Sequence, residues 1–149
     1  HLAANLDDIV WLINPEKETL YDFLIRSKTM ANESIQNSVL NFEEDISDTN
    51  KSIILNVNLK RNLLLFLKEA INNIAKHAKA DTVSIHFTMT KQILGLKVID
   101  DGCGFNLDNH AEGNGLASIR NRAKLIKGTL TITSKIDSGT QIHLNVKIP

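Results

Sequence analysis

The sequence lacks most of the features that mark an extracellular, membrane-spanning or nucleic-acid-binding protein. Cys103 is the only cysteine among 149 residues, so no internal disulfide can form and a reducing, intracellular setting is expected. The 17 basic residues are balanced by 17 acidic ones and form no run, which argues against nucleic acid as a partner. The longest apolar stretch, Leu63 to Leu67, is far too short to cross a bilayer.

No signal peptide is visible at the N-terminus. The N-terminus has neither the basic start nor the apolar run of a signal peptide. The chain opens at His1 in a helix-like pattern and ends at Pro149 after a strand-like one. We therefore expect a cytoplasmic piece of a longer protein, whose other segments could include a membrane anchor.

Residues 1–36 are expected to form a helical segment that precedes the main domain. Apolar residues recur there at spacings of four, three and four, which places them on one seam: Leu2, Leu6, Ile9 and Ile13. Asn14-Pro15 should interrupt this helix, because the residue before a proline avoids the helical conformation. A second helix is expected over 16–33. This strip buries little surface alone, so it needs a partner surface.

Residues 37–149 are expected to form one domain. Alternation and helical periodicity predict strands near 39–46, 53–55, 82–89, 93–99, 129–134 and 140–148, a turn at 47–52, and helices over 59–78 and 116–126. Asn58 is expected to cap the first of these helices, and Gly128 to end the second. The order favours an α/β fold, more closely an α+β two-layer sandwich in which helices cover one face of a mixed β-sheet.

The helix predicted over 59–78 carries a polar group of residues beside its apolar stripe. Glu69, Asn73 and Lys76 are spaced four and then three apart, which stacks them on one helix face. A carboxylate, an amide and a cation next to a core are costly to desolvate unless partners satisfy them. A metal ion and phosphates would do so, since Mg²⁺ prefers oxygen ligands and shares them with nucleotide phosphates. Taken alone, the pattern also fits a solvated helix face.

A strand ending in two acids and two glycines forms the second motif, at Asp100-Asp101-Gly102-Cys103-Gly104. The glycines allow a sharp turn and a close approach to a planar ligand. A carboxylate at the end of the strand can accept hydrogen bonds from an exocyclic amine. An acidic calcium loop or a plain hairpin turn is the alternative, although the acids are not spaced as in an EF-hand.

The third motif is Gly113-Asn114-Gly115-Leu116, which leads directly into a helix. A helix N-terminus offers free backbone amides and the positive end of a dipole to phosphate. A Rossmann fingerprint would need a third glycine in register and a strand directly before the first. A P-loop would need Gly-Lys-Ser/Thr after its spacer. Neither pattern is present.

Together these motifs resemble the ATP-binding domain shared by bacterial sensor histidine kinases, DNA gyrase, the Hsp90 chaperone and MutL, known as the Bergerat or GHKL fold. The residues from Glu69 to His77 match its N box, those from Asp100 to Gly104 its first glycine box, and those from Gly113 to Leu116 its second. The resemblance covers roughly residues 38–149, and it implies that residues 1–36 are a linker from a dimerisation and phosphoacceptor region. Within the family the chain is most similar to kinases of the nitrate-sensor and thermosensor type, which share Glu-Ala, Asn and Lys-His-Ala in the N box and a short segment at 105–112.

The resemblance implies an adenine subsite built from the strand ends. Asp100 would accept a hydrogen bond from the adenine amine, and Gly102 and Gly104 would form the floor beside the purine. Thr140 would support the base through its hydroxyl, with water between them. His77 is instead expected to pack at the helix end.

The resemblance also implies a Mg²⁺ and phosphate subsite. Asn73 would ligate the metal, and Glu69 would be the general base, as in the ATP hydrolases of the family. Four further residues would face the phosphates: Lys76, Gly113, Gly115 and Leu116. Arg122, on the helix that follows, is expected to pair at the surface.

In a complete kinase of this type, an acidic residue directly follows the phosphoacceptor histidine. None of the five histidines here has one. We therefore expect the acceptor to lie upstream, the chain to bind ATP without labelling itself, and the parent to be a homodimer that passes phosphate to a response regulator. Three alternatives remain: a regulatory module or anti-sigma-type serine kinase, an ATP-gated machine of the gyrase class, and an interaction domain that binds no nucleotide.

Overall fold

One mixed sheet of five strands organises the described part of the chain, in the order β1-β2-β3-β5-β4. The computed structural model describes Leu6, residues 9–10, 18–108 and 114–149. The strands are β1 (Val39–Asp45), β2 (Thr82–Thr90), β3 (Ile93–Asp100), β4 (Thr129–Ser134) and β5 (Thr140–Lys147). Strand β1 runs parallel to β2, and every other neighbouring pair is antiparallel. The predicted hairpins β2–β3 and β4–β5 are therefore confirmed.

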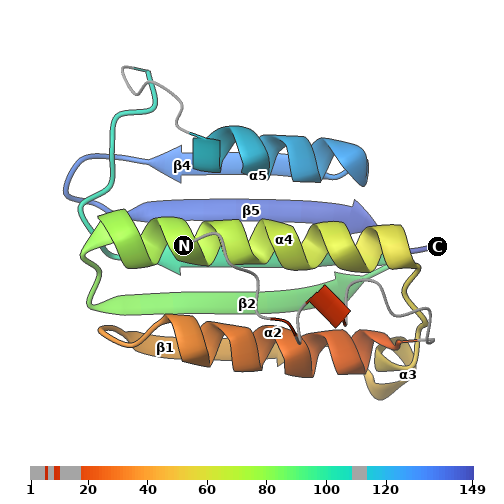
Figure 1. Ribbon diagram of the computed structural model, residues 1–149. Helices are drawn as coiled ribbons and strands as arrows, with labels where there is room; N and C mark the ends of the chain where they lie inside the picture. The colour runs from red at the N-terminus through yellow and green to blue at the C-terminus, as the bar shows by residue number, and fades with distance from the viewer. Residues whose placement is uncertain (1–5, 7–8, 11–17, 109–113) are drawn as a thin grey trace.

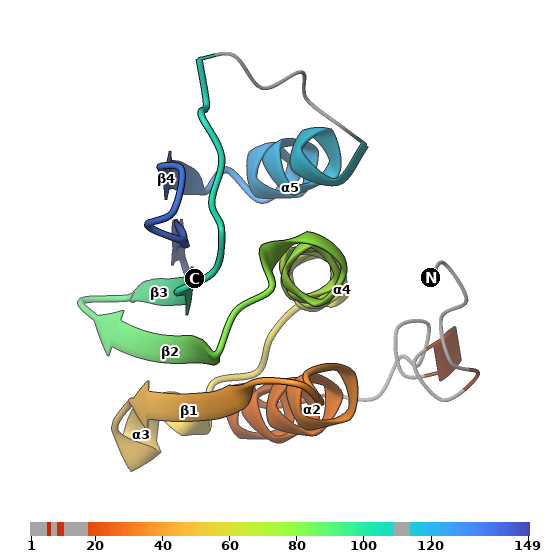
Figure 2. The ribbon, with the colours of Figure 1, turned by 90° about the vertical axis from the view of Figure 1, so that its left-hand side faces the viewer.

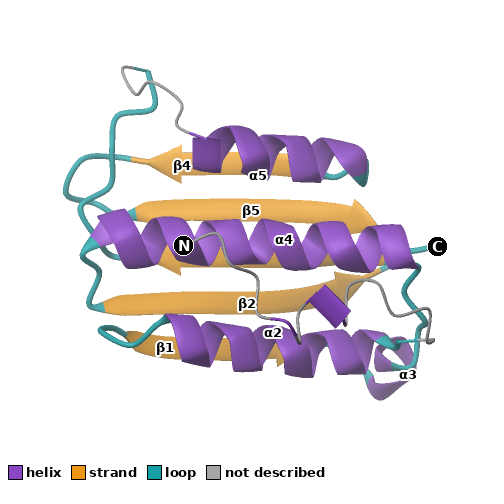
Figure 3. Cartoon of the chain, viewed as in Figure 1, coloured by secondary structure: helices purple, strands orange, loops and turns teal. Residues whose placement is uncertain are grey.

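Helices lie against one face of this sheet. These are α2 (Leu20–Ser34), α4 (Val57–Asn73), which continues into the π-helix η1 (Ile74–Ala78), and α5 (Asn114–Leu125). The one-turn helix α3 (Asp48–Lys51) lies apart from them, at the β1 edge of the sheet (Figures 1 and 2), and buries no residue. Seen from the side, α2, α4 and α5 form one layer with α4 in the middle, and the sheet forms the other (Figures 1 and 2). Figure 3 shows the same arrangement by element type. The predicted fold class, a mixed sheet with helices on one face, is confirmed. No helix in the described residues is long and apolar enough to cross a membrane.

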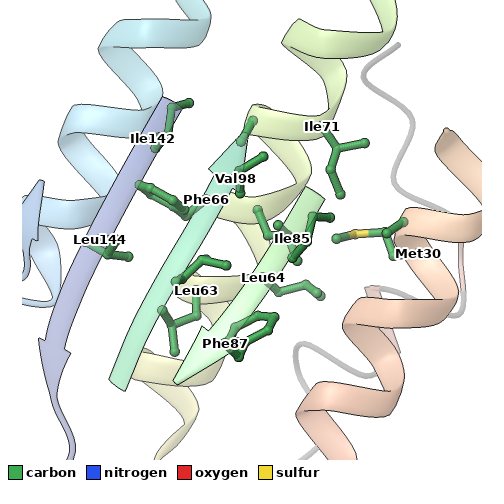
Figure 4. Close-up of a cluster of buried hydrophobic side chains, with 14 of the residues drawn as sticks. Met30, Leu63, Leu64, Phe66, Ile71, Ile85, Phe87, Val98, Ile142 and Leu144 are labelled. Atoms are coloured by element: carbon green, nitrogen blue, oxygen red, sulfur yellow. The ribbon is translucent and has the colours of Figure 1, made fainter. Parts of the chain in front are cut away.

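The core lies between α4 and the three central strands (Figure 4). Side chains alternate along each strand, so that Ile85, Val98 and Ile142 point toward the helices and are buried. Phe66 on α4 is fully buried against this face. Burying a side chain of this size contributes about 1.5–3 kcal/mol to the stability of the fold. The packing of Phe66 therefore fixes the position of α4 on the sheet.

Helix α2 shares the same hydrophobic core. It begins with a capping box, in which the Thr19 hydroxyl accepts from the Asp22 backbone amide. Phe23 is fully buried and meets Phe87 of β2 edge to face, with ring centroids 6.0 Å apart. In packing, α2 therefore belongs with the sheet. The division of the chain after residue 36 stays a prediction, because most of the seam that motivated it lies outside the described residues.

Three local predictions before α4 were wrong. Residues 53–55 form no strand, and Ile54 makes only a single bridge to Thr19. The polar stretch predicted as a turn contains α3, which Ser47 caps. Asn56 rather than Asn58 caps α4, because Asn56 has an extended backbone and its side-chain oxygen accepts from the Leu59 amide at 2.8 Å.

The C-terminal end of α5 is closed by Lys127 rather than by Gly128. Lys127 takes the left-handed conformation at φ 56°, which is the position usually given to glycine. The Gly128 amide donates to the Ala123 carbonyl at 2.8 Å, as in a Schellman motif. Gly128 serves close packing instead, since a Cβ there would lie 2.7 Å from Leu144 Cδ1.

The helix predicted over 59–78 changes its winding at Ile74. From Ile74 to Ala78 it is a π-helix, which ends at Lys79 with φ 50°. A π-turn holds more residues than an α-turn, so side chains beyond Asn73 do not follow the α-helical spacing. Such turns often occur at functional sites.

Candidate functional site

A cavity of about 460 Å³ lies where the C-terminal half of α4 meets the ends of β3 and β5. Its walls come from α4, η1, β3 and the loop after it, the first turn of α5, and β5. The lining residues are Ala70, Asn73, Ile74, His77, Ala78, Val98, Asp100, Cys103, Gly104, Phe105, Gly115, Leu116, Thr140 and Ile142. The size suits a nucleotide or another small organic ligand.

Asp100 is the one buried carboxylate among the described residues, with 6% of its surface exposed. Burial raises the pKa of its carboxyl group, and the negative charge of Asp101 adds to the rise. The amides of Gly102 and Thr140 oppose it, and the Gly102 amide donates to Asp100 Oδ1 at 2.9 Å. The ionised group can only accept hydrogen bonds, so this end of the cavity fits a ligand that donates them.

Asp101 has a different, structural task. Its carboxylate is exposed and accepts from the backbone amides of Thr82 and Asp81, both at 2.9 Å. These bonds lower the pKa of Asp101, chiefly through the Thr82 amide. Asp101 thereby fixes the start of β2 to the end of β3, the strand end that carries Asp100.

The loop after β3 is pressed against the end of η1, and glycine makes this possible. A Cβ on Gly102 would lie 2.1 Å from the Ala78 carbonyl oxygen, a distance that no side chain tolerates. The Cys103 amide donates to the same oxygen at 2.7 Å. Gly104 follows in the left-handed conformation at φ 58°. The loop therefore forms a floor of backbone beside Asp100.

Two oxygen-bearing side chains of α4 face the first turn of α5. A Cβ built on Gly115 would lie 2.5 Å from Asn73 Oδ1 and 3.0 Å from Glu69 Oε1. Both oxygens therefore lie close against Gly115 at the N-terminus of α5, where free amides and the helix dipole favour an anion. No group of three or more His, Cys, Asp or Glu side chains in the described ranges is arranged to hold a metal. A cation here would have to share its ligands with an anion or water.

Comparison with known proteins identifies the family of this site. Residues 58–149, well over half of the chain, match the family described as histidine kinase-, DNA gyrase B- and HSP90-like ATPase. The chain belongs to this ATPase family. Membership makes ATP the ligand of the domain.

Two curated relatives are bacterial sensors. The chain is 34% identical over 110 residues to the sensor histidine kinase LiaS of Bacillus subtilis, covering 73% of this chain and 29% of that protein. It is 37% identical over 92 residues to the sensor protein VraS of Staphylococcus saprophyticus, covering 61% of this chain and 26% of that protein. The chain thus spans less than a third of the length of these relatives.

Solved structures share the fold of this ATPase domain. The histidine kinase domain of the blue-light activated kinase EL346 of Erythrobacter litoralis aligns with a TM-score of 0.69 and 17% identity, over 93% of this chain and 67% of that one. The catalytic domain of the histidine kinase ThkA aligns with a TM-score of 0.67 and 14% identity, over 89% and 95%. At these identities the comparison concerns the fold alone.

Most residues predicted for the site come together in the cavity of this ATPase domain. Its wall includes Asn73, Asp100, Gly104, Gly115, Leu116 and Thr140. Glu69 lies beside Gly115, and Gly102, in the loop that forms the floor, packs against the backbone of Ala78. Gly113 lies outside the described residues. The roles of all these residues remain predictions, since geometry places them but does not test them.

Lys76 does not line this cavity, although its spacing predicted that it shares a face with Asn73. It borders a second hollow, formed by residues 33–38, 74–76 and 79–81. The π-helix is the physical reason, because it turns Lys76 away from the direction that α-helical spacing gives.

Several cavity residues were not predicted from the sequence. Val98 and Ile142 form an apolar wall and pair across β3 and β5. Strand alternation could have found them, since each lies two residues from Asp100 or Thr140 on the same face. His77 lines the cavity while staying exposed. Arg122, predicted to pair at the surface, donates to the buried Asn62 side chain at 3.1 Å and ties α5 to α4.

Proposed function

We propose that the chain is the catalytic ATP-binding domain of a two-component sensor histidine kinase. It transfers the γ-phosphoryl group of Mg·ATP to a histidine outside residues 1–149. One observation carries the proposal: a single cavity is lined by the buried acceptor Asp100, by Asn73 and by Gly115 in the first turn of α5, with Glu69 next to Gly115. Relatives named as sensor kinases support the choice within the ATPase family.

The purine lies at the Asp100 end of the cavity. Asp100 accepts from the exocyclic amine, and the apolar side chains of Val98 and Ile142 lie beside the base. Gly104 and the Cys103 backbone provide a floor that approaches the ring closely. Thr140, which pairs with Asp100 across the sheet, supplies a second polar contact.

The phosphates lie at the first turn of α5. The amides around Gly115 and Leu116 bind them, with Gly113 at the start of the same loop. Asn73 would ligate Mg²⁺ through Oδ1, and the residues fit because Asn73 Oδ1 and Glu69 Oε1 both lie near Gly115 and Mg²⁺ prefers oxygen ligands. Bound Mg²⁺ neutralises phosphate charge. Glu69 is the proposed general base. Lys76 faces another hollow, so a phosphate contact would need its side chain to move.

The transfer step depends on position and charge more than on covalent chemistry of the domain. The cavity holds the nucleotide by its base, and the α5 amides orient the terminal phosphate toward an imidazole nitrogen brought by the acceptor domain. The phosphorus–nitrogen bond forms as the bond to the leaving ADP oxygen breaks. Phosphate then passes to an aspartate of a response regulator, and the parent acts as a homodimer.

The purified chain is expected to bind ATP without labelling itself. Incubation with γ-³²P-labelled ATP and Mg²⁺ should label an added dimeric helical segment that carries a histidine followed by an acidic residue. The product should be labile in acid and stable in alkali. Phosphohistidine on the chain itself would contradict the expectation, and an acid-stable phosphoserine on a protein partner would favour the anti-sigma-type alternative.

Replacing Asn73 by alanine is expected to remove the Mg²⁺ dependence of ATP binding. In the unaltered chain, removal of Mg²⁺ by EDTA should lower the affinity for ATP by about tenfold or more. This is the size of effect seen when residues that support a metal site are mutated. Asn73→Ala should bind equally weakly with and without EDTA. Asn72→Ala is the matched control, since Asn72 is the preceding residue of α4 and does not line the cavity. Calorimetry measures both. A full Mg²⁺ response in Asn73→Ala would exclude Asn73 as a ligand.

A further inference from the structure

Three polar residues form a row across the sheet at the cavity end. Asp100 of β3 pairs with Thr140 of β5, and Thr140 pairs with Ser134 of β4. Alternation along the strands turns all three toward the helix layer, as it does for the cavity residues Val98 and Ile142. Asp100 and Thr140 line the cavity. Ser134 lies next to Thr140 on β4 and does not line the cavity.

The Ser134 hydroxyl makes three contacts, all within hydrogen-bond distance. The Phe105 backbone amide lies 2.9 Å from Ser134 Oγ, and the Gly139 carbonyl oxygen lies 3.2 Å from it. Thr140 Oγ1 lies 2.8 Å away. Ser134 therefore links the loop after β3, the β4–β5 turn and a residue of the cavity wall.

Only one distribution of protons satisfies these contacts together. An amide can only donate, so Phe105 donates to Ser134, and a carbonyl can only accept, so Ser134 gives its single proton to Gly139. Thr140 must then donate its own proton to the remaining lone pair of Ser134. The Thr140 oxygen is left with lone pairs alone for any other partner.

We propose that Ser134 is a positioning residue that sets base selectivity by fixing the Thr140 hydroxyl as a hydrogen-bond acceptor. This deepens the proposed function and rests on it. The ionised Asp100 is also an acceptor, so this end of the cavity presents acceptors only. A purine with an amino group at position 6 donates to them, directly or through water. A 6-oxo purine places its own acceptor against them and is rejected, because unpaired buried polar groups are costly.

The test compares the affinities of ATP and inosine triphosphate, which differ at position 6, by calorimetry with Mg²⁺. Ser134→Ala frees the Thr140 proton to turn toward the ligand, so the ratio of the two affinities should shrink by about fivefold, the value of one hydrogen bond. Thr140→Val should shrink it similarly. The double variant should match Thr140→Val alone, because both changes act through one hydroxyl. Ser134→Thr keeps a hydroxyl and should restore the ratio.

Ser38→Ala is the matched control. Its hydroxyl also bonds a backbone carbonyl, that of Ala80 at 2.6 Å, but Ser38 does not line this cavity. It should leave the ratio unchanged. An unchanged ratio in Ser134→Ala, or an equal loss for both nucleotides, would overturn the inference while leaving the proposed function intact. Failure of the unaltered chain to bind either nucleotide would overturn both.

Discussion

Asp100→Asn is expected to lower the affinity for ATP by about 100-fold or more. The carboxylate is buried, so its hydrogen bonds are not screened by water, and bonds to a charged group are worth about 1.5–3 kcal/mol each. The amide that replaces it has nearly the same shape but turns at least one donor toward the Gly102 amide or the ligand amine. Donor then faces donor at a position that water reaches poorly. Calorimetry with a non-hydrolysable ATP analogue measures the loss.

Asp137→Asn is the control for this variant. Asp137 lies in the nearby β4–β5 turn with an exposed side chain, and does not line the cavity. Asparagine accepts its left-handed backbone, with φ 62°, as readily as aspartate does. ATP affinity should stay unchanged. Full binding by Asp100→Asn would mean that Asp100 does not contact the base.

The pH dependence of ATP binding gives a second comparison of the unaltered chain with Asp100→Asn. Burial raises the pKa of Asp100, so its carboxylate is lost at a higher pH than usual as the solution is acidified. Binding needs the ionised form. ATP affinity of the unaltered chain should therefore fall as the pH drops through this raised pKa, whereas Asp100→Asn should lack that component. Comparing the two removes the titration of the phosphates themselves.

Gly139→Ala is expected to destabilise the fold by roughly 3 kcal/mol and to abolish ATP binding as well. Gly139 has φ 77°, where residues with a Cβ are strained. The added methyl would also lie 2.0 Å from the Asp100 carbonyl oxygen, which is backbone and cannot rotate away. Relief requires the turn to move off β3, and Thr140 moves with it. Urea denaturation measures the stability.

Gly95→Ala is the matched control for this substitution. Its Cβ would also meet a close neighbour, at 2.5 Å, but that atom is the Thr88 hydroxyl oxygen at the end of a side chain. The side chain can rotate, and Gly95 has no positive φ. The loss should therefore stay below about 1 kcal/mol. Equal losses for the two variants would show that the backbone contact at Gly139 is not the cause.

Periodicity predicted the sheet and the central helix because both are decided by short-range alternation of apolar residues. The hairpins β2–β3 and β4–β5 have clear period-two patterns and short connections, so their pairing follows almost from spacing alone. The apolar run at 53–55 reads like a strand too. It is not one, because Ile54 pairs only with Thr19, at the N-cap of α2, in a single bridge that extends no strand of the sheet. Only tertiary contacts decide such a case.

The candidate site was predictable to the extent that a motif fixes local backbone. Asp100 and the glycines after it had to lie at a strand end and a turn, and Asn73 had to lie on the helix face beside the core. Lys76 failed because no sequence pattern announces a π-helix. Ser134 went unnoticed because its importance comes from Phe105 and Thr140, which are 29 and 6 residues away.

The neighbouring residues Asp100 and Asp101 carry the same functional group. Asp100 lines the cavity, whereas Asp101 accepts a hydrogen bond from the backbone amide of Thr82. What separates them is parity along the chain, since successive side chains leave a strand on opposite sides. A slip of β3 by one residue would exchange their tasks without altering composition, and would send the apolar residues of the strand outward at the same time. The chemistry of the cavity and the burial of the core are thus encoded by one register, so neither can drift in evolution independently of the other.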